Sequence, residues 1–396
     1  MNSNESVTSS LFTKEFTKNP YPVYAQLREM DPIYKCAFPH GSHGWMITRY
    51  EDAVEAFKDP RLSKDAVKLG GQQGHQSVFA RSMLFSDPPD HKRLRGLVQQ
   101  SFTPVMIEEM RGRIQEIADE LLDGFRGRDE IHLIDEFAFP LPIIVICEML
   151  GIPAEDRDKF RLWSSTLIEG YNEENAGKMK QHTEEFVQYL GQMFDRLRAE
   201  PGRDMISKLI AAEEEGDKLT EQELYGVVAL LIIAGHETTV NLIGNSILTL
   251  LQYPDQLERL VRQPELIHTA IEESLRFNGP VEFSTGRWAR EDFNFKGKEF
   301  KKGDLVIIAL NSANHDPRQF ESPDVFDITR EKSPHLAFGK GIHLCLGAPL
   351  ARLEGEIAIH SLLQRYPNLR LNAGIDELEW RPGMIVRGVK EIPLTL

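Results

Sequence analysis

Cysteine is scarce in this sequence, and positive charge is not in excess. The 396 residues include 3 cysteines, Cys36, Cys147 and Cys345, which lie far apart and form no Cys-x-x-Cys pair. A disulfide framework or a zinc cage needs several closely spaced cysteines, so neither is expected. The formal net charge of -15 argues against a general nucleic-acid or anionic-membrane surface, because both partners require clustered Lys and Arg.

Long hydrophobic runs and a targeting segment are also missing. The longest apolar stretches, residues 141–147 and 227–234, are far shorter than the ~20 residues that a membrane-spanning helix needs. The first twenty residues lack the basic start, apolar stretch and cleavage site of a secretory signal. We therefore expect no membrane anchor and a cytoplasmic protein.

The pattern of apolar residues predicts a mainly α protein with small β-sheets. Most segments between residues 19 and 302 repeat apolar residues about every 3.6 positions, which is typical of helices. No repeat, low-complexity tract or flexible linker interrupts the chain, so residues 1–396 are predicted to form a single catalytic domain. Strands are predicted at residues 44–48, 293–295, 298–300, 305–309 and 384–386.

A long helix is predicted from a capping box at Thr220 and Glu223 to the stop at Pro254. Its middle, residues 227–234, is apolar on nearly all sides, which indicates a core position. The pattern then breaks at residues 235–239, Gly-His-Glu-Thr-Thr, where polar groups replace the apolar residues that would stabilise a core helix better.

Cys345 stands in a glycine-rich segment, Phe-Gly-Lys-Gly-Ile-His-Leu-Cys-Leu-Gly, that leads into a predicted helix from Ala348. A helix start favours the thiolate form of cysteine, which is the form that binds metals. Gly347 allows a flat ligand to approach the backbone closely. A cysteine taken alone is more often a buried cysteine beside a glycine-rich turn, and the ten-residue context of Cys345 favours the metal ligand instead. Cys147, in an apolar run, is expected to be a structural thiol, as is Cys36.

This segment resembles the haem-binding loop of cytochromes P450, which it matches at Phe338, Gly339, Gly341, His343, Cys345 and Gly347. The resemblance implies the cytochrome P450 fold, a triangular prism with haem b between a long central helix and the cysteine-bearing loop. In that family the cysteine thiolate is the axial iron ligand and promotes cleavage of the O–O bond. The resemblance assigns this role to Cys345, with Phe338 and Gly339 in the cofactor-binding loop.

The break in the long helix resembles the oxygen-activation motif of the same family. The resemblance makes Glu237 and Thr238 the catalytic residues that deliver and orient protons. Thr238 can hydrogen-bond to the carbonyl of Ala234 or release it, which would widen the helix locally. Seen alone, the same residues are as consistent with a surface carboxylate and a harmless kink. His236 is expected to be a packing or outward residue.

Glu273 and Arg276 lie three residues apart on a predicted helix, where such a pair is usually solvent-exposed and weak. The resemblance instead assigns them to the Glu-x-x-Arg signature of the family, a buried structural pair. Arg330 is the expected third member. The segment 325–327, Val-Phe-Asp, departs from family variants that carry Arg directly before this Phe.

Four cationic side chains match the positions of the family's ligands to the haem propionates. These are His91 and Arg95, spaced i, i+4, together with Arg287 and His343. The alternative for the helical pair is an exposed basic face. Lys92, Arg93 and Lys340 are interpreted as surface residues that dock an acidic electron donor.

The resemblance implies insertion of one oxygen atom of O2 into a hydrophobic small molecule. Electrons are expected from NAD(P)H through a ferredoxin or flavodoxin and its reductase. The pattern is closest to bacterial enzymes that tailor polyketides and macrolides. Apolar substrate contacts are predicted at Ala234, Val281, Phe283 and Ile385.

Two other hypotheses are open at this point, and a third, a zinc protein, is rejected. A peroxide-driven fatty-acid hydroxylase needs no redox partner, and a non-catalytic haem-binding or sensor protein would consume no NADPH. A zinc-thiolate protein lacks ligands near Cys345 other than His343.

Overall fold

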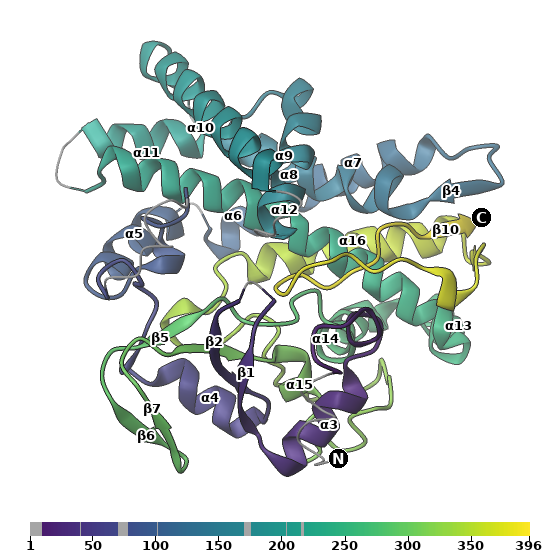
Figure 1. Ribbon diagram of the computed structural model, residues 1–396. Helices are drawn as coiled ribbons and strands as arrows, with labels where there is room; N and C mark the ends of the chain where they lie inside the picture. Colours follow the sequence, from purple (N-terminus) through teal and green to yellow (C-terminus); the bar gives the residue numbers. More distant parts are fainter. Residues whose placement is uncertain are drawn as a thin grey trace. The chain divides into compact units, whose positions relative to one another are not determined.

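The computed structural model describes residues 10–39, 41–69, 78–100, 102–169, 176–202, 204–214 and 218–396. It is mainly helical with small sheets, as predicted (Figure 1). The chain folds as two compact units. Unit 1 is built from Met1–Leu62, Gly112–Leu141 and Thr238–Leu396, and unit 2 from Ser63–Arg111 and Pro142–Glu237.

Unit 1 contains a mixed sheet with strand order β1-β2-β8-β5-β3. β2 pairs with β1 antiparallel and with β8 parallel, and β8 pairs with β5 antiparallel. The central strand β8 reads Leu-Val-Ile-Ile and is almost wholly buried, as a strand covered on both faces requires. The bounds are β1 Ile33–Ala37, β2 His43–Ile47, β3 Leu62–Ser63, β5 Arg287–Ala289 and β8 Leu305–Ile308.

Two smaller sheets complete the β structure. One has the order β4-β10-β9, and the other is the hairpin β6-β7. The hairpin alternates buried Phe293 and Phe295 with exposed Asn294, which is the period-2 pattern of a strand with one face on the core. The bounds are β4 Glu130–His132, β6 Phe293–Phe295, β7 Lys298–Phe300, β9 Arg370–Leu371 and β10 Pro393–Thr395.

Four of the five predicted strands are confirmed, to within one residue at either end, as β2, β6, β7 and β8. The prediction of a strand at residues 384–386 is wrong. Only Val386 forms a β-bridge there, to Val281. The ladder does not extend toward Met384 because Phe283, which would face it, bridges to Ala309 instead, and Gly383 has a φ of 127°.

Unit 1 also holds most of the shorter helices. Apolar residues of α2, α3, α4 and α15 pack on the mixed sheet in two clusters, one of which includes Phe57 of α4, with α4 and α3 beside β1 and β2 in Figure 1. The bounds are α2 Lys14–Lys18, α3 Tyr21–Met30, α4 Tyr50–Lys58, α7 Arg111–Asp123 (its first residue in unit 2), α13 Pro254–Arg262, α14 Ile267–Phe277, α15 Leu310–Asn314 and α16 Ala348–Arg365.

Unit 2 is helical in the residues that the structure describes. Aromatic rings of α9 and α10, Phe160, Trp163, Phe186 and Tyr189, pack edge to face or tilted at centroid distances of 5.2–6.2 Å. The bounds are α5 Asp90–Gln99, α6 Pro104–Glu109, α8 Pro140–Leu150 (its first two residues in unit 1), α9 Arg157–Glu169, α10 Ala176–Ala199 and α11 Met205–Glu214.

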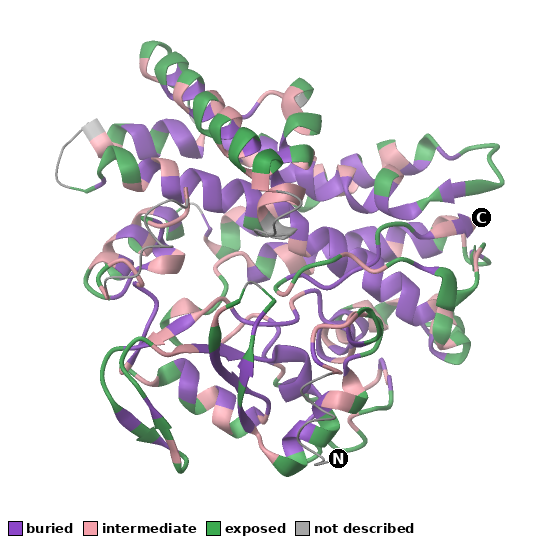
Figure 2. Cartoon of the chain, viewed as in Figure 1, coloured by how far each residue is buried: buried purple, intermediate pink, exposed green. Residues whose placement is uncertain are grey.

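The longest helix, α12 (Glu221–Gln252), runs from unit 2 into unit 1. The predicted capping box is confirmed, because the Glu223 backbone N–H donates to Thr220 Oγ1 at 3.3 Å and the Thr220 N–H donates to Glu223 Oε2 at 2.8 Å. By length and composition this helix could span a membrane, but 83% of its most apolar window is buried inside the protein, as in a core helix (Figure 2).

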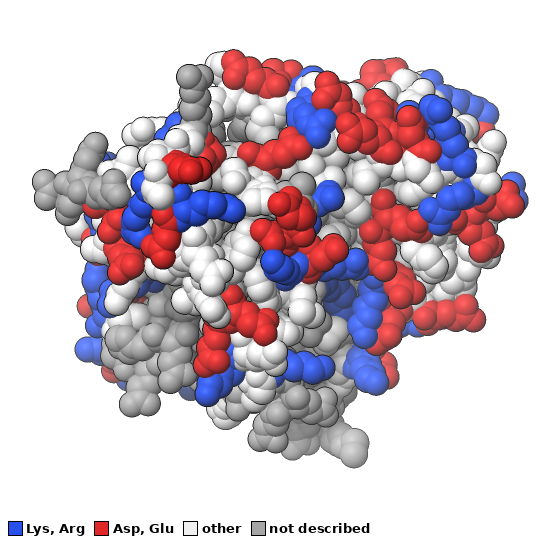
Figure 3. All heavy atoms as spheres, turned by 90° about the horizontal axis from the view of Figure 1, so that it is seen from above, with Lys and Arg blue, Asp and Glu red and all other residues white. Residues whose placement is uncertain are grey.

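The surface carries both signs of charge. On the face drawn in Figure 3, Lys and Arg side chains are interspersed with Asp and Glu. The described residues on that face form no continuous basic surface, in keeping with the net charge of -15.

Candidate functional site

The loop of residues 336–347, here called the Cys345 loop, has a backbone that depends on glycine. Gly339 and Gly341 have φ angles of 70° and 79°, in the left-handed region that other residues avoid. A Cβ on Gly341 would also lie 3.0 Å from the carbonyl oxygen of Phe57. The backbone at Gly341 therefore packs against α4 as only glycine permits.

The thiol of Cys345 lies three residues before α16 and is exposed. Its backbone N–H donates to the carbonyl oxygen of Phe338 at 3.0 Å, so these two predicted residues are brought together. Cys36 and Cys147 differ, because burial raises the pKa of each thiol to about 12 and keeps it protonated. Of the three cysteines, Cys345 alone has its thiol open to solvent.

The surroundings of Cys345 fit a flat, largely apolar group that carries a metal, such as haem. Ile342 and Leu344 are 52% and 47% exposed, and a Cβ built on Gly347 would meet no atom within 4 Å. Across the part of the chain that the structure describes, no group of three His, Cys, Asp or Glu is placed to hold a metal ion. A zinc centre has no ligand set among these residues, whereas a porphyrin brings its own nitrogen ligands.

Arg287 and the Cys345 loop both lie against Phe57 of α4. Arg287, on β5, is 4% exposed, and its guanidinium lies 4.6 Å from the ring centroid of Phe57. The same phenylalanine lies beside Gly339 and Gly341. Sequence reasoning missed Phe57, because helical periodicity marks it only as a core residue. His343 ends a 3-10 turn in the loop and is half-buried.

In unit 2, α5 presents His91 and Arg95 one turn apart. His91 is 4% exposed and Arg95 is half-buried. Burial lowers the pKa of His91, and the positive charge of Arg95 lowers it further, against the opposing effect of Asp87. The charge of Arg95 therefore disfavours a second cation on His91, and an anion bound beside them would oppose this effect.

In the middle of α12, small and polar residues interrupt the buried apolar run and are partly accessible. Ala234 is exposed and Thr238, one turn later, is half-buried, while their apolar neighbours are buried. The helix remains α-helical from end to end, so the predicted local widening is not present. Glu237 is 2% exposed. An acid shielded from water thus adjoins an accessible hydroxyl.

His236 is a packing residue, as expected. It is fully buried, and its Nδ1 lies 2.7 Å from the carbonyl oxygen of Ile232, which can only accept, so Nδ1 donates. Its Nε2 lies 3.8 Å from Glu237 Oε1.

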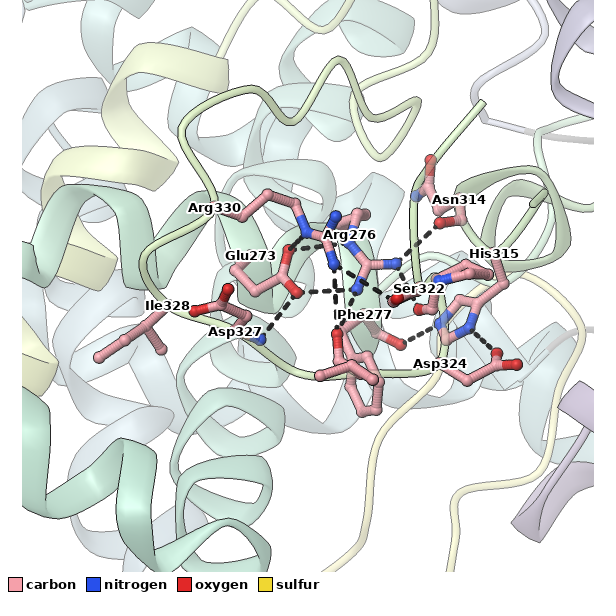
Figure 4. Close-up of polar contacts among 12 residues, drawn as sticks. Glu273, Arg276, Phe277, Asn314, His315, Ser322, Asp324, Asp327, Ile328 and Arg330 are labelled. Carbon is pink, nitrogen blue, oxygen red and sulfur yellow. Dashed lines mark hydrogen bonds and ion pairs between the residues drawn. The ribbon is translucent and has the colours of Figure 1, made fainter. Parts of the chain in front are cut away.

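Glu273, Arg276 and Arg330 form one buried network (Figure 4). Arg276 donates to both Glu273 oxygens at 2.8 Å, and both side chains are 0% exposed, unlike an ordinary surface pair. Arg330 Nε donates to Glu273 Oε2 at 3.1 Å. Asp327, in the segment that departs from the family pattern, contributes only its backbone N–H, at 3.1 Å from Glu273 Oε1.

The predicted substrate contacts differ in their accessibility. Val281 is half-buried and Ile385 is 39% exposed, and the Val281–Val386 bridge brings their segments side by side. Phe283 is 2% exposed in a core cluster, with its ring 5.9 Å from Phe12 and 6.3 Å from Tyr24. The prediction that Phe283 contacts substrate is therefore wrong.

The expected donor-docking residues also differ. Lys92 is exposed and Lys340 is half-buried. Arg93 instead pairs with Glu223 at 2.5 Å, a carboxylate that is 12% exposed at the start of α12. The structure therefore gives Arg93 a partner within unit 2.

Comparison with known proteins identifies close relatives along nearly the whole chain. A family model described as Cytochrome P450 matches residues 158–392. The polyketide biosynthesis cytochrome P450 PksS of Bacillus subtilis is 43% identical, over 97% of both chains. The vitamin D(3) 25-hydroxylase of Pseudonocardia autotrophica is 45% identical, over 98% of this chain and 96% of that protein.

A solved structure has the same fold. The myxobacterial cytochrome P450 CYP267B1 in complex with myristic acid superposes with a TM-score of 0.94, at 41% identity, over 97% of this chain and 98% of that one.

Proposed function

The chain belongs to the cytochrome P450 family, and from this premise we propose that Cys345 is the residue that holds the haem iron. The family uses haem b with an axial cysteine thiolate, and this chain is a cytochrome P450 monooxygenase. The observation that carries the proposal is the exposed thiol of Cys345, placed before α16 by a glycine-dependent loop. We further propose that residues 1–396 act as one catalytic domain, because α12 runs through both units.

When bound, haem supplies O2 binding and cleavage of the O–O bond. His91, Arg95, Arg287 and His343 would pair with its two propionates, because each cation gains from an adjacent anion. The lowering of the His91 pKa by the charge of Arg95, which a bound anion would oppose, supports this role for the α5 pair. Phe338 and Gly339 would hold the loop backbone against the cofactor.

Glu237 and Thr238 are proposed to move protons. Glu237 is shielded from bulk water, so it can pass a proton without leaking it, and Thr238 presents a hydroxyl on the accessible side of α12. The small side chain of Ala234 leaves room beside that hydroxyl. Glu273, Arg276 and Arg330 would act as structural support, because none of them reaches solvent substantially.

The proposed substrate is a polyketide or macrolide-like compound, hydroxylated or epoxidised at an apolar position. The similarity of this chain to PksS supports this substrate class. The proposed apolar contacts to the substrate are Ala234, Val281 and Ile385. Electrons would arrive from NAD(P)H through a ferredoxin or flavodoxin and its reductase in the cytoplasm, with exposed Lys92 and half-buried Lys340 available to an acidic donor. A peroxide-driven reaction is not favoured, because it can dispense with the proton relay of Glu237 and Thr238.

The test is turnover of a macrolactone by the haem-loaded protein with NADPH, a ferredoxin, its reductase and isotopically labelled O2. We expect one labelled oxygen in the product and a substrate-induced shift of the haem absorption band. A fatty acid and a secosteroid serve as competing substrates, and faster turnover of either would contradict the polyketide proposal. Equal product formation with H2O2 and no reductase would contradict the proposed electron route.

A further inference from the structure

Glu272, the residue before Glu273 on α14, contacts a different set of side chains from its neighbour. Arg352 donates to both of its oxygens, from Nε to Oε1 at 2.5 Å and from Nη2 to Oε2 at 3.0 Å. Nε2 of His335 lies 3.3 Å from Oε2. His335 directly precedes the Cys345 loop, and Arg352 follows it in the first turns of α16. A single carboxylate therefore joins the two ends of the loop.

The histidine of this cluster is held in one orientation. Its side chain is 2% exposed, and its Nδ1 accepts from the backbone N–H of Ala337 at 3.2 Å. Because Nδ1 is an acceptor, the ring hydrogen is on Nε2, which faces Glu272. His335 thus contacts the carboxylate through its N–H side.

Phe338 connects the cluster to Cys345. The guanidinium of Arg352 lies 4.6 Å from the Phe338 ring centroid, and the His335 ring lies 5.9 Å from it. The carbonyl oxygen of Phe338 accepts the N–H of Cys345. A continuous series of contacts therefore leads from Glu272 to the backbone of the cysteine.

The Glu272 carboxylate is charged at neutral pH. Burial alone would raise its pKa, but the contacts with His335 and Arg352 outweigh burial and lower the pKa to about 2. A planar guanidinium that pairs with a charged carboxylate through two parallel bonds has a fixed orientation. The ring of Phe338 therefore lies beside a rigid partner.

A second anchor joins the start of the loop to the neighbouring network. The N–H of Leu336 donates to Asn314 Oδ1 at 2.7 Å, and the Asn314 carbonyl accepts from Arg276. Adjacent carboxylates of α14 thus serve separate purposes. Glu273 holds the segment around Asp327 and Arg330, whereas Glu272 closes the Cys345 loop.

We propose that Glu272, His335 and Arg352 are positioning residues that hold Phe338, and through it the backbone of Cys345, so that the sulfur keeps its ligating position. The inference rests on the proposed role of Cys345 as the iron ligand. It predicts how long the thiolate stays bound to the haem iron, and this time can be measured separately from the stability of the fold.

The experiment compares haem-loaded Arg352→Met and Glu272→Gln with Arg365→Met. Arg365 is a matched control, because it lies on the same helix, is also 30% exposed and also pairs with carboxylates, Asp119 and Asp123. The readouts are the absorption band of the reduced carbon monoxide complex over time, the midpoint potential of the haem, and thermal unfolding.

We expect Arg352→Met and Glu272→Gln to lose the long-wavelength thiolate band about tenfold faster than wild type, and to shift the midpoint potential. Arg365→Met should unfold at a lower temperature but keep the band and the potential. Arg352→Lys should be intermediate, because it keeps the charge but loses the two-pronged contact and the stacked plane.

Equal rates of band loss in Arg352→Met and Arg365→Met would overturn the positioning role. Should Arg352→Met not fold, Phe338→Leu tests the same point, and a wild-type band lifetime in that variant would overturn it. A thiolate band that survives in Cys345→Ser would instead refute the proposed ligand, which is a different failure.

Discussion

The Cys345 loop and the middle of α12 contribute to the proposed chemistry in opposite ways. In the loop the backbone is unusual, with glycines at φ of 70° and 79°, and the reactive thiol is exposed. In α12 the backbone is an ordinary α-helix, and the unusual features are side chains, a buried Glu237 and an accessible Thr238. We therefore expect the loop to lose its function when a substitution alters the shape of its backbone. We expect α12 to lose its function when a substitution removes a functional group from a side chain.

The largest expected effect concerns the electrostatic contact that closes the loop. Because the folded-state pKa of Glu272 is lowered to about 2, its ion pair stabilises the fold above the unfolded pKa near 4.5 and loses this effect as pH falls toward 2. The contribution at pH 7 is at most about 3 kcal/mol. Denaturant unfolding should therefore show a difference between wild type and Glu272→Gln that shrinks below pH 4.5.

The control for this titration is Glu258→Gln, which alters an exposed pair with Arg262 on α13. It should change stability little at any pH. A difference between wild type and Glu272→Gln that stays constant from pH 7 to pH 3.5 would contradict the account.

In the helix, Glu237→Gln should remove the shielded acid without changing the shape. Product formation should fall by about 100-fold, because a positioned acid contributes at least that factor, while the unfolding temperature changes little. The matched control is Glu221→Gln at the exposed start of the same helix. Unchanged product formation in Glu237→Gln would show that protons reach the site by another route.

In the loop, Gly341→Ala should act through shape alone. The φ of 79° strains any side chain, and the new Cβ would press on the Phe57 carbonyl at 3.0 Å, so we expect a loss of about 2 kcal/mol in stability and a fall in haem content. Gly297→Ala is the control, with a φ of 85° and nothing within 4 Å of the new Cβ. It should lose about 1 kcal/mol and keep its haem. Equal haem content in both variants would contradict the packing argument.

The smallest effect is expected for Thr238→Ala. Loss of one hydroxyl that orients protons should lower product formed per electron consumed by about tenfold, the equivalent of one hydrogen bond. Thr249→Ala, on the same helix, removes a buried hydroxyl bonded to the Asn245 carbonyl and should affect stability only. Coupling of NADPH use to product would be measured in both, and equal coupling would exclude Thr238 from the relay.

Local features of the fold could be predicted from sequence, because short-range rules determine them. The capping box at Thr220, the hairpin strands around Lys298 and the glycine-dependent Cys345 loop all follow from residues near one another in the chain. The strand expected at residues 384–386 failed because Phe283, in its partner segment, bridges to Ala309 instead, which no local pattern reveals.

Site residues whose roles depend on contacts between distant segments could not be predicted from the sequence pattern alone. Arg330 was found by resemblance to a family pattern. Phe57 and Arg352 were missed, because their roles depend on Arg287 and Glu272, which are remote in sequence. Phe283 was assigned to substrate as an apolar residue in the segment after Pro280, and the sequence does not tell that the core covers its ring.

The central claim, thiolate ligation by Cys345, is tested most directly by the absorption spectrum of the reduced, haem-loaded protein under carbon monoxide. Wild type should show the long-wavelength band of thiolate-ligated haem, and Cys345→Ser should lack it. A histidine-type band in wild type, or an unchanged thiolate band in Cys345→Ser, would contradict the assignment.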